Sequence, residues 1–164
     1  MPVPCESRKP PSLVILQHRS RFIVGDMDEA AQQVVMDAAE LYRRLYRAEP
    51  EVGVFAPGRV NLIGEHTDYN DGFVMPFAIP FITVVVGSRT QSLETQVSST
   101  FSGDDIVSFT INKSLAKGEP EWANYVKGTI AQYVDDLPPG LAFNACIASN
   151  VPTGSGLSSS AALE

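Results

Sequence analysis

The feature that most restricts how this chain can fold is the run of residues 57–72, which follows an apolar stretch. A strand is predicted over residues 52–56, and Pro57-Gly58 then indicates a turn into a tight loop. The loop carries four ionisable residues in close succession: Arg59, Glu65, His66 and Asp68. A second turn, Asn70-Asp71-Gly72, leads toward another strand, so the loop is predicted to connect a hairpin.

Apolar residues separate these charges. Val60, Leu62 and Ile63 prefer burial, so the charged groups sit on a partly buried scaffold and need partners. A polyhydroxylated ligand supplies them, because carboxylates accept hydrogen bonds from adjacent hydroxyls, imidazole donates or accepts one, and guanidinium donates through a fixed fork. A salt-bridged surface loop is the alternative that the residues by themselves leave open.

A second motif follows a predicted buried strand over residues 141–149. Gly154 and Gly156 allow backbone amides to approach a ligand without an intervening Cβ. Serines 158–160 then stand at a predicted helix start, where free amides favour an anion. The motif lacks the Gly-Lys-Ser/Thr of a Walker loop. These residues predict a phosphate-binding loop, with a flexible connector as the alternative.

The residues of both motifs are similar to those of one protein family. Residues 57–70, Pro-Gly-Arg-Val-Asn-Leu-Ile-Gly-Glu-His-Thr-Asp-Tyr-Asn, resemble the signature of galactokinases, the sugar branch of the GHMP kinase superfamily. Residues 152–161, Pro-x-Gly-x-Gly-Leu-Ser-Ser-Ser-Ala, resemble the ATP loop of GHMP kinases. The resemblance implies an α+β fold over residues 26–164: the GHMP-kinase N-terminal domain (ribosomal protein S5 domain 2-like), with a mixed sheet and helices, incomplete here. Residues 1–25 are expected to be a disordered or unrelated extension.

The resemblance also implies a reaction and a set of site residues. Galactokinases transfer the γ-phosphoryl group of MgATP to the anomeric hydroxyl of α-D-galactose. By this similarity the sugar hydroxyls bind Glu65, His66 and Asp68, and Arg59 lies by the anomeric oxygen and the transferred phosphoryl group as a catalytic residue. The ATP phosphates bind Gly154, Gly156, Ser158 and Ser159, with Ser158 helping to place Mg²⁺.

Two alternatives remain open, an N-acetylgalactosamine kinase and a non-catalytic sensor of galactose and ATP. Family members are much longer, and their catalytic aspartate, magnesium-binding glutamate and C-terminal domain lie beyond the position of Glu164. The 164 residues alone are therefore expected to be an inactive fragment that exposes apolar surface.

Charge and cysteine content restrict the partners. A formal net charge of −7 argues against nucleic acid, and it is uneven, because residues 1–25 carry four basic residues against one acidic residue. Cys5 and Cys146 lie far apart and give no disulfide framework. No apolar run reaches membrane-spanning length. We expect a cytoplasmic protein that binds no membrane, with a monomer as the expected state.

The remaining elements follow from periodicity. A helix is predicted to start at Asp26, with Asp26 and Glu29 as a capping box, and to end at Pro50. Strands are predicted over residues 93–100 and 106–111, joined by a turn in which Asp104-Asp105 is interpreted as a solvated pair. A helix is predicted over residues 122–134. Its apolar side, predicted to pack against the domain, contains Trp122, Tyr125, Val126, Thr129, Ile130 and Tyr133. Core packing is favoured for Trp122, with stacking on a nucleotide as the alternative.

Overall fold

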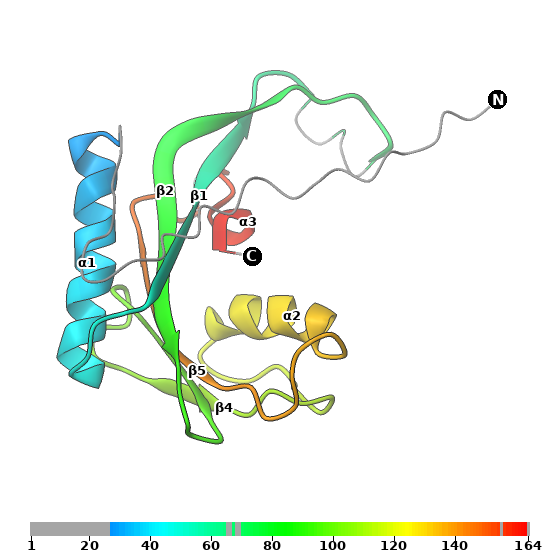
Figure 1. The fold of residues 1–164 in the computed structure, drawn as a ribbon. Coiled ribbons are helices and arrows are strands. Elements are labelled where there is room, and N and C mark those ends of the chain that lie inside the picture. The colour runs from blue at the N-terminus through cyan, green and yellow to red at the C-terminus, as the bar shows by residue number, and fades with distance from the viewer. Residues whose placement is uncertain (1–26, 65–66, 68–69, 155, 164) are drawn as a thin grey trace.

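One mixed sheet organises the protein, and helices lie on both of its faces in the computed structural model (Figure 1). The structure describes residues 27–64, 67, 70–154 and 156–163. In chain order the elements are α1 (Glu29–Tyr46), β1 (Val52–Asn61), β2 (Pro76–Arg89), β3 (Thr95–Ser99), β4 (Val107–Phe109), α2 (Ala123–Tyr133), β5 (Phe143–Ser149) and α3 (Ser159–Leu163). None of the helices in these residues is long and apolar enough to cross a membrane.

The sheet has the strand order β1-β2-β5-β3-β4. The β1–β2, β2–β5 and β3–β4 pairs are antiparallel, whereas β3 and β5 are parallel, so the sheet is mixed as expected. Because parallel neighbours need a crossover, the chain passes from β3 through β4 and α2 before it returns as β5. The predicted strands over residues 93–100 and 106–111 are confirmed with shorter bounds.

Helix α1 covers one face of the sheet. Its predicted apolar side is confirmed, and the strand residues that alternate toward it complete a core. This core contains Ala31, Val34, Val35, Ala38, Leu41, Tyr42, Ile82, Val84, Val86, Cys146 and Ala148. Leu45 packs against its edge. Burial of this side, rather than helix propensity, stabilises α1.

The start of α1 differs from the prediction. Asp28 is the N-cap, and its carboxylate accepts a hydrogen bond from the Ala31 amide at 2.7 Å. Asp26, the predicted cap, lies outside the described residues. Glu29 is the first helical residue rather than the second half of a capping box. The helix ends at Tyr46, followed by Arg47 in the left-handed region, so Pro50 lies beyond its true end.

Helices α2 and α3 lie on the opposite face of the sheet (Figure 1). A second core forms there around Val97, Phe109 and Ala145, packed by the α2 residues Val126 and Ile130. Trp122 packs against this core, as favoured from the sequence. The two cores use alternate residues of the same strands, which is why the strands are apolar on both sides.

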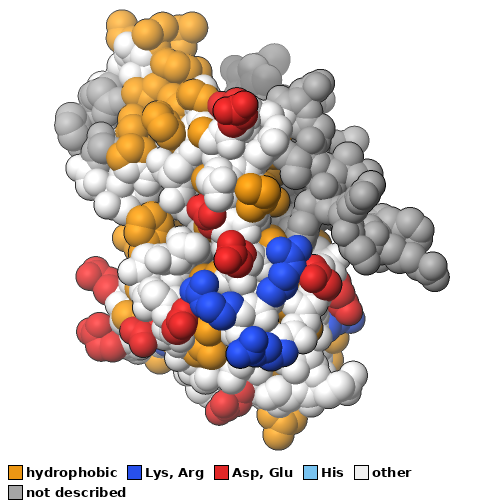
Figure 2. Space-filling model, turned by 90° about the vertical axis from the view of Figure 1, so that its left-hand side faces the viewer, with side chains coloured by type: hydrophobic (Ala, Val, Ile, Leu, Met, Phe, Trp, Pro, Cys, Tyr) orange, Lys and Arg blue, Asp and Glu red, His pale blue; other side chains and the backbone are white. Residues whose placement is uncertain are grey.

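Apolar side chains remain exposed at the end of the β1–β2 hairpin. The exposed fractions are 68% for Leu62, 69% for Ile63, 100% for Phe73 and 58% for Met75. Figure 2 shows hydrophobic side chains gathered at this end of the molecule, whereas charged side chains gather lower on the same view. The described residues therefore include exposed apolar surface at the hairpin end.

Candidate active site

The sugar-binding motif lies on and beyond β1. The turn predicted at Pro57-Gly58 is wrong: β1 continues through both residues to Asn61, with a break in the β1–β2 register between Pro57 and Arg59. A proline is accommodated there because β1 is an edge strand and the register break needs no amide donor at that point. The predicted hairpin is confirmed, with its connection at residues 62–75.

Thr67 organises this connection. Its hydroxyl donates to the carbonyl oxygen of Gly64 at 2.6 Å and lies 3.1 Å from that of Phe73, and its own carbonyl accepts from the Gly72 amide at 2.7 Å. Residue 67 therefore ties both limbs of the loop together. Glu65, His66 and Asp68, the predicted sugar ligands, lie outside the described residues. Thr67 was not singled out from the sequence, although a hydroxyl within a tight loop is a common turn former.

Arg59 lies where the two motifs meet. Its backbone amide donates to the carbonyl oxygen of Leu157, in the glycine- and serine-rich loop, at 3.1 Å. Its guanidinium Nη1 lies 3.4 Å from the Asn61 Oδ1, and the residue is partly buried. Gly58 permits this approach, because a Cβ there would lie 2.9 Å from the Leu157 oxygen. Arg59 and Leu157, about one hundred positions apart in the sequence, thus lie side by side in the structure.

The glycine- and serine-rich loop runs from the end of β5 to α3. Gly154 and Gly156 have φ angles of 70° and 74°, in the left-handed region that favours glycine. A Cβ added at either would meet nothing within 4 Å, so among the described residues no atom fills the space beside them. This agrees with the predicted open approach to the backbone.

Helix α3 starts at Ser159, which confirms the predicted helix start at the serines. Ser158 precedes it with a φ of 61°, and its carbonyl oxygen accepts from the Ala162 amide at 3.0 Å. A non-glycine residue in this region costs free energy and is common where a site needs a particular backbone shape. Asn150 anchors the other end of the loop, because its Oδ1 accepts from the Ile82 amide at 2.7 Å.

A cavity of about 220 Å³ opens beside this loop, between the sheet, α2 and α3. Its lining is largely apolar and aromatic, with hydroxyl groups at the side of the loop. It includes Phe101, Trp122, Tyr125, Ile147, Val151, Leu163, Thr153, Ser159 and Ser160. The sequence indicated Trp122 and Tyr125 on one helix and Ser159 and Ser160 in the second motif. It did not indicate that Phe101 lies beside them, because Phe101 comes from a separate segment.

Trp122 both lines this cavity and packs against the second core. Its indole Nε1 is buried, and no protein group among the described residues accepts from it. Buried polar groups in proteins are nearly always paired, so this donor is an exception. Because Trp122 takes part in both the core and the cavity wall, the structure is compatible with both roles considered from the sequence.

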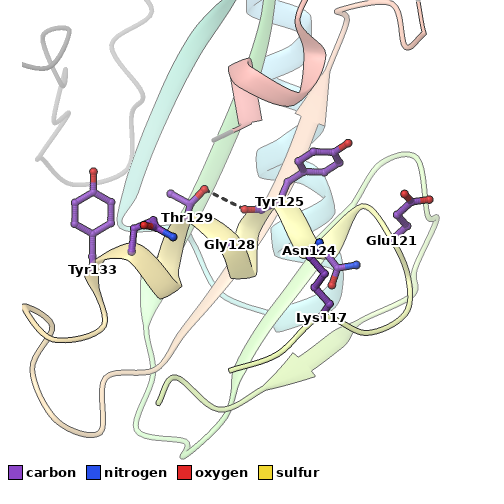
Figure 3. A pocket seen from close by; sticks show the side chains of 8 residues that line it. Lys117, Glu121, Asn124, Tyr125, Gly128, Thr129 and Tyr133 are labelled. Carbon is purple, nitrogen blue, oxygen red and sulfur yellow. Dashed lines mark hydrogen bonds between the residues drawn. The ribbon is translucent and has the colours of Figure 1, made fainter. Parts of the chain in front are cut away.

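A larger hollow of about 600 Å³ lies along the outer side of α2. Lys117 and Glu121 lie near one end of it and Tyr133 near the other (Figure 3), so its polar side chains do not converge on one point. Tyr133 is 58% exposed and lines this outer hollow, which corrects the prediction that it packs on the inner side of α2. Tyr125 is 38% exposed and lines both this hollow and the cavity between the sheet, α2 and α3. The inner side is centred nearer Val126 and Ile130, and Tyr133 belongs to the last turn.

The Asp104-Asp105 pair does not form a metal site in the described residues. The Asp104 Oδ1 pairs with the Arg44 Nη2 at 2.7 Å and accepts from its Nε at 3.0 Å. No group of three histidine, cysteine or acidic side chains that could hold a metal occurs in the part of the chain that the structure describes. The ion pair places Asp104 on the surface as a turn residue with a basic partner.

Comparison with known proteins identifies the family. The family model described as the galactokinase galactose-binding signature matches residues 40–89. Human galactokinase is 47% identical over 138 residues, which are 80% of this chain and 35% of that protein. A Haemophilus influenzae galactokinase is 43% identical over 134 residues, 79% of this chain and 34% of that protein. This chain belongs to the galactokinase family.

Solved structures agree with this assignment. A galactokinase of Lactococcus lactis, complexed with galactose, superposes with a TM-score of 0.71 and 35% identity over 80% of this chain and 34% of its own. Mevalonate kinase of Methanococcus jannaschii, at 22% identity and a TM-score of 0.57 over 68% of this chain and 36% of its own, shares the fold alone. The expected GHMP-kinase fold is thereby confirmed. This galactokinase-family chain spans about a third of the length of the curated relatives it matches, 35% for the human protein.

Proposed function

We propose that the protein carrying this chain is a galactokinase, which transfers the γ-phosphoryl group of ATP to the anomeric hydroxyl of α-D-galactose and yields galactose 1-phosphate. The observation that supports it most is the match of the galactose-binding signature to residues 40–89, together with the hydrogen bond that joins Arg59 to the glycine- and serine-rich loop. Sugar motif and phosphate motif therefore meet on one side of the domain. The proposal assigns residues 26–164 to the N-terminal GHMP-kinase domain.

The sugar contacts in this proposal come from the hairpin connection. Glu65, His66 and Asp68 bind the hydroxyls of galactose, because carboxylates and imidazole match the donors and acceptors of a hexose. Arg59 lies by the anomeric oxygen. A permanently charged guanidinium lowers the pKa of a nearby hydroxyl and stabilises negative charge on the transferring group. Phosphoryl transfer needs mainly such positioning and charge stabilisation.

The nucleotide contacts come from the second motif. Gly154, Gly156, Ser158 and Ser159 bind the phosphates of ATP, and the open space beside both glycines supports this. The base lies in the cavity that Trp122 and other aromatic side chains line. A nucleotide in this position extends from the aromatic cavity along the loop toward Arg59.

Magnesium fits the donor set that this chain offers. The hydroxyl of Ser158 is a hard oxygen ligand, and Mg²⁺ in nucleotide sites typically combines few protein ligands with phosphate oxygens and water. When bound, the ion neutralises charge on the phosphates. The backbone of Ser158 has a φ of 61°, and its carbonyl oxygen accepts a hydrogen bond from the Ala162 amide, so this backbone is tied to the start of α3.

A kinetic comparison of sugars tests the proposal. We expect the complete protein with MgATP to phosphorylate galactose with a higher kcat/KM than N-acetylgalactosamine. A higher kcat/KM for N-acetylgalactosamine would contradict the proposal and indicate an N-acetylgalactosamine kinase instead. Binding of galactose and ATP by calorimetry with no turnover of either sugar replaces it with a sensor. Fractionation and analytical ultracentrifugation test the cytoplasmic location and monomeric state that we include in the proposal.

A further inference from the structure

Phe101 is a large aromatic residue that the core does not use. It lies in the turn between β3 and β4, and 66% of it is exposed. Full burial of a phenylalanine contributes roughly 1.5–3 kcal/mol. Core packing therefore does not explain an aromatic residue at this position.

The backbone beneath Phe101 is held firmly. The Ser102 amide donates to the Ser99 carbonyl oxygen at 2.9 Å, and the Ser102 hydroxyl donates to the same oxygen at 3.0 Å. The Phe101 amide donates to the Ser99 hydroxyl at 3.3 Å. The turn thus presents the ring from a fixed position. It also engages both serine hydroxyls, which leaves them less free to recognise a ligand.

The same ring lines the cavity beside the glycine- and serine-rich loop. Phe101 and Trp122 both contribute to its wall, and they come from different segments, the β3–β4 turn and the start of α2. Ser159 and Ser160 at α3 line the same cavity. Aromatic walls that a planar group can stack on bind any base, whereas hydrogen-bonding side chains would select one.

We propose that Phe101 is a nucleotide-binding residue that stacks on the purine base of ATP. This inference rests on the proposed function, because it requires the triphosphate to lie at Gly154–Ser159. In it the base covers the exposed ring of Phe101, on the side of the cavity that Trp122 also lines. Phe101 sets how tightly the nucleotide binds and takes no part in the chemical step.

Steady-state kinetics of the complete protein test this role. We expect Phe101→Ala to raise the KM for ATP about tenfold, the effect of losing one stacked base. The kcat and the KM for galactose stay unchanged, because none of the described residues of the hairpin connection lines this cavity. Phe101→Tyr restores the KM for ATP, since tyrosine offers the same stacking face. The preference for ATP over UTP falls in Phe101→Ala, because the larger purine loses more stacking area than the pyrimidine.

Leu93→Ala is the matched control. Leu93 is 82% exposed, lies in the β2–β3 connection and does not line this cavity, so its removal leaves both KM values unchanged. An unchanged KM for ATP in Phe101→Ala, in a protein whose wild type phosphorylates galactose, overturns this inference and leaves the proposed function standing. Failure of the wild type to use ATP on galactose overturns the proposed function itself.

Discussion

The backbone amide of Arg59 donates a hydrogen bond to the carbonyl oxygen of Leu157, with 3.1 Å between the two atoms. Arg59 belongs to an edge strand, and Leu157 belongs to the loop before α3. This bond therefore joins the backbone of the motif at residues 57–72, predicted to bind the sugar, to that of the motif at residues 152–161, predicted to bind phosphate. Because of this bond, the position of the Arg59 guanidinium depends on the glycine- and serine-rich loop. The position of that loop depends in turn on the register break in β1 between Pro57 and Arg59. Five predictions follow from this arrangement and from the two cores.

The contact between Gly58 and Leu157 leaves no room for a side chain. A Cβ at residue 58 would lie 2.9 Å from the Leu157 oxygen and 3.1 Å from the Ile79 Cδ1. We expect Gly58→Ala in the complete protein to lower the free energy of unfolding by about 1–3 kcal/mol and to raise the KM for ATP. Urea unfolding and steady-state kinetics measure the two effects.

Gly128→Ala is the control for that substitution. Gly128 lies inside α2, and a Cβ there would meet nothing within 4 Å. Alanine is the better helix former, so this variant should gain about 0.5–1 kcal/mol and keep its KM for ATP. If both alanine variants behave alike, the close approach at residue 58 is not what limits that position.

Arg59 is expected to act through the parallel N–H donors of its planar guanidinium group as well as through its charge. Arg59→Lys keeps the charge but loses the two parallel donors. We expect kcat to fall about 100-fold, the range seen when one preorganised donor to a developing charge is lost. Arg89→Lys, at the exposed end of β2, should leave kcat unchanged. A kcat for Arg59→Lys equal to that of the wild type contradicts the assigned role.

Asp28 caps α1 through the Ala31 amide at 2.7 Å. Asp28→Ala leaves that amide without its side-chain acceptor, so the free energy of unfolding should fall by about 1 kcal/mol. Asp37 is exposed on the same helix and only accepts from Gln33 one turn away, so Asp37→Ala should change stability by less than about 0.5 kcal/mol. Thermal or urea unfolding of both variants distinguishes a cap from general surface charge.

Burial raises the pKa of the Cys146 thiol from 9.0 to about 12, and Arg44 offsets this only in part. Because the folded state holds its proton over a range in which the unfolded state releases it, stability is complete below pH 9 and is lost as the pH rises toward 12. The expected slope is about 1.4 kcal/mol per pH unit. Burial also raises the pKa of Tyr42 and Tyr46, so the slope should steepen above pH 10.

Urea unfolding between pH 8 and 11 measures this slope, and Cys146→Ala separates the contributions. The alanine variant should be less stable at pH 8 but should lose the part of the slope that begins near pH 9, so its deficit should shrink as the pH rises. In the native protein Cys146 should also resist alkylation, since its side chain is fully buried. Rapid modification of Cys146 in native conditions would contradict the burial.

The 164 residues by themselves are expected to show no galactose-dependent ATP turnover, because relatives such as human galactokinase are about three times as long as the matched region, which is 35% of that protein. Exposed Leu62, Ile63 and Phe73 at the hairpin end should also make the isolated chain associate at high concentration. A coupled kinase assay and light scattering test both points. Turnover by the purified chain would contradict the first, and a monomer at every concentration the second.

The sequence by itself determined the family, the order of the elements and the inner side of α1. Periodic apolar residues report which side of a helix is buried, and the two motifs carry enough specific residues to identify the family. The local sequence pattern predicted where helices and strands begin and end less well. Asp28 rather than Asp26 is the cap, and β1 passes through Pro57-Gly58, because an edge strand with a register break tolerates a proline that an isolated pattern reads as a turn.

Only the tertiary structure decided what meets at the site. The bond from Arg59 to Leu157 and the cavity shared by Phe101 and Trp122 join segments that are distant in the chain. Nothing in their local spacing reports this, because strand order and the crossover from β3 to β5 set those distances. Phe101 shows the difference most clearly: along the chain it is one exposed aromatic residue in a turn, and only the packing of α2 and α3 on the same face gives it a cavity to line.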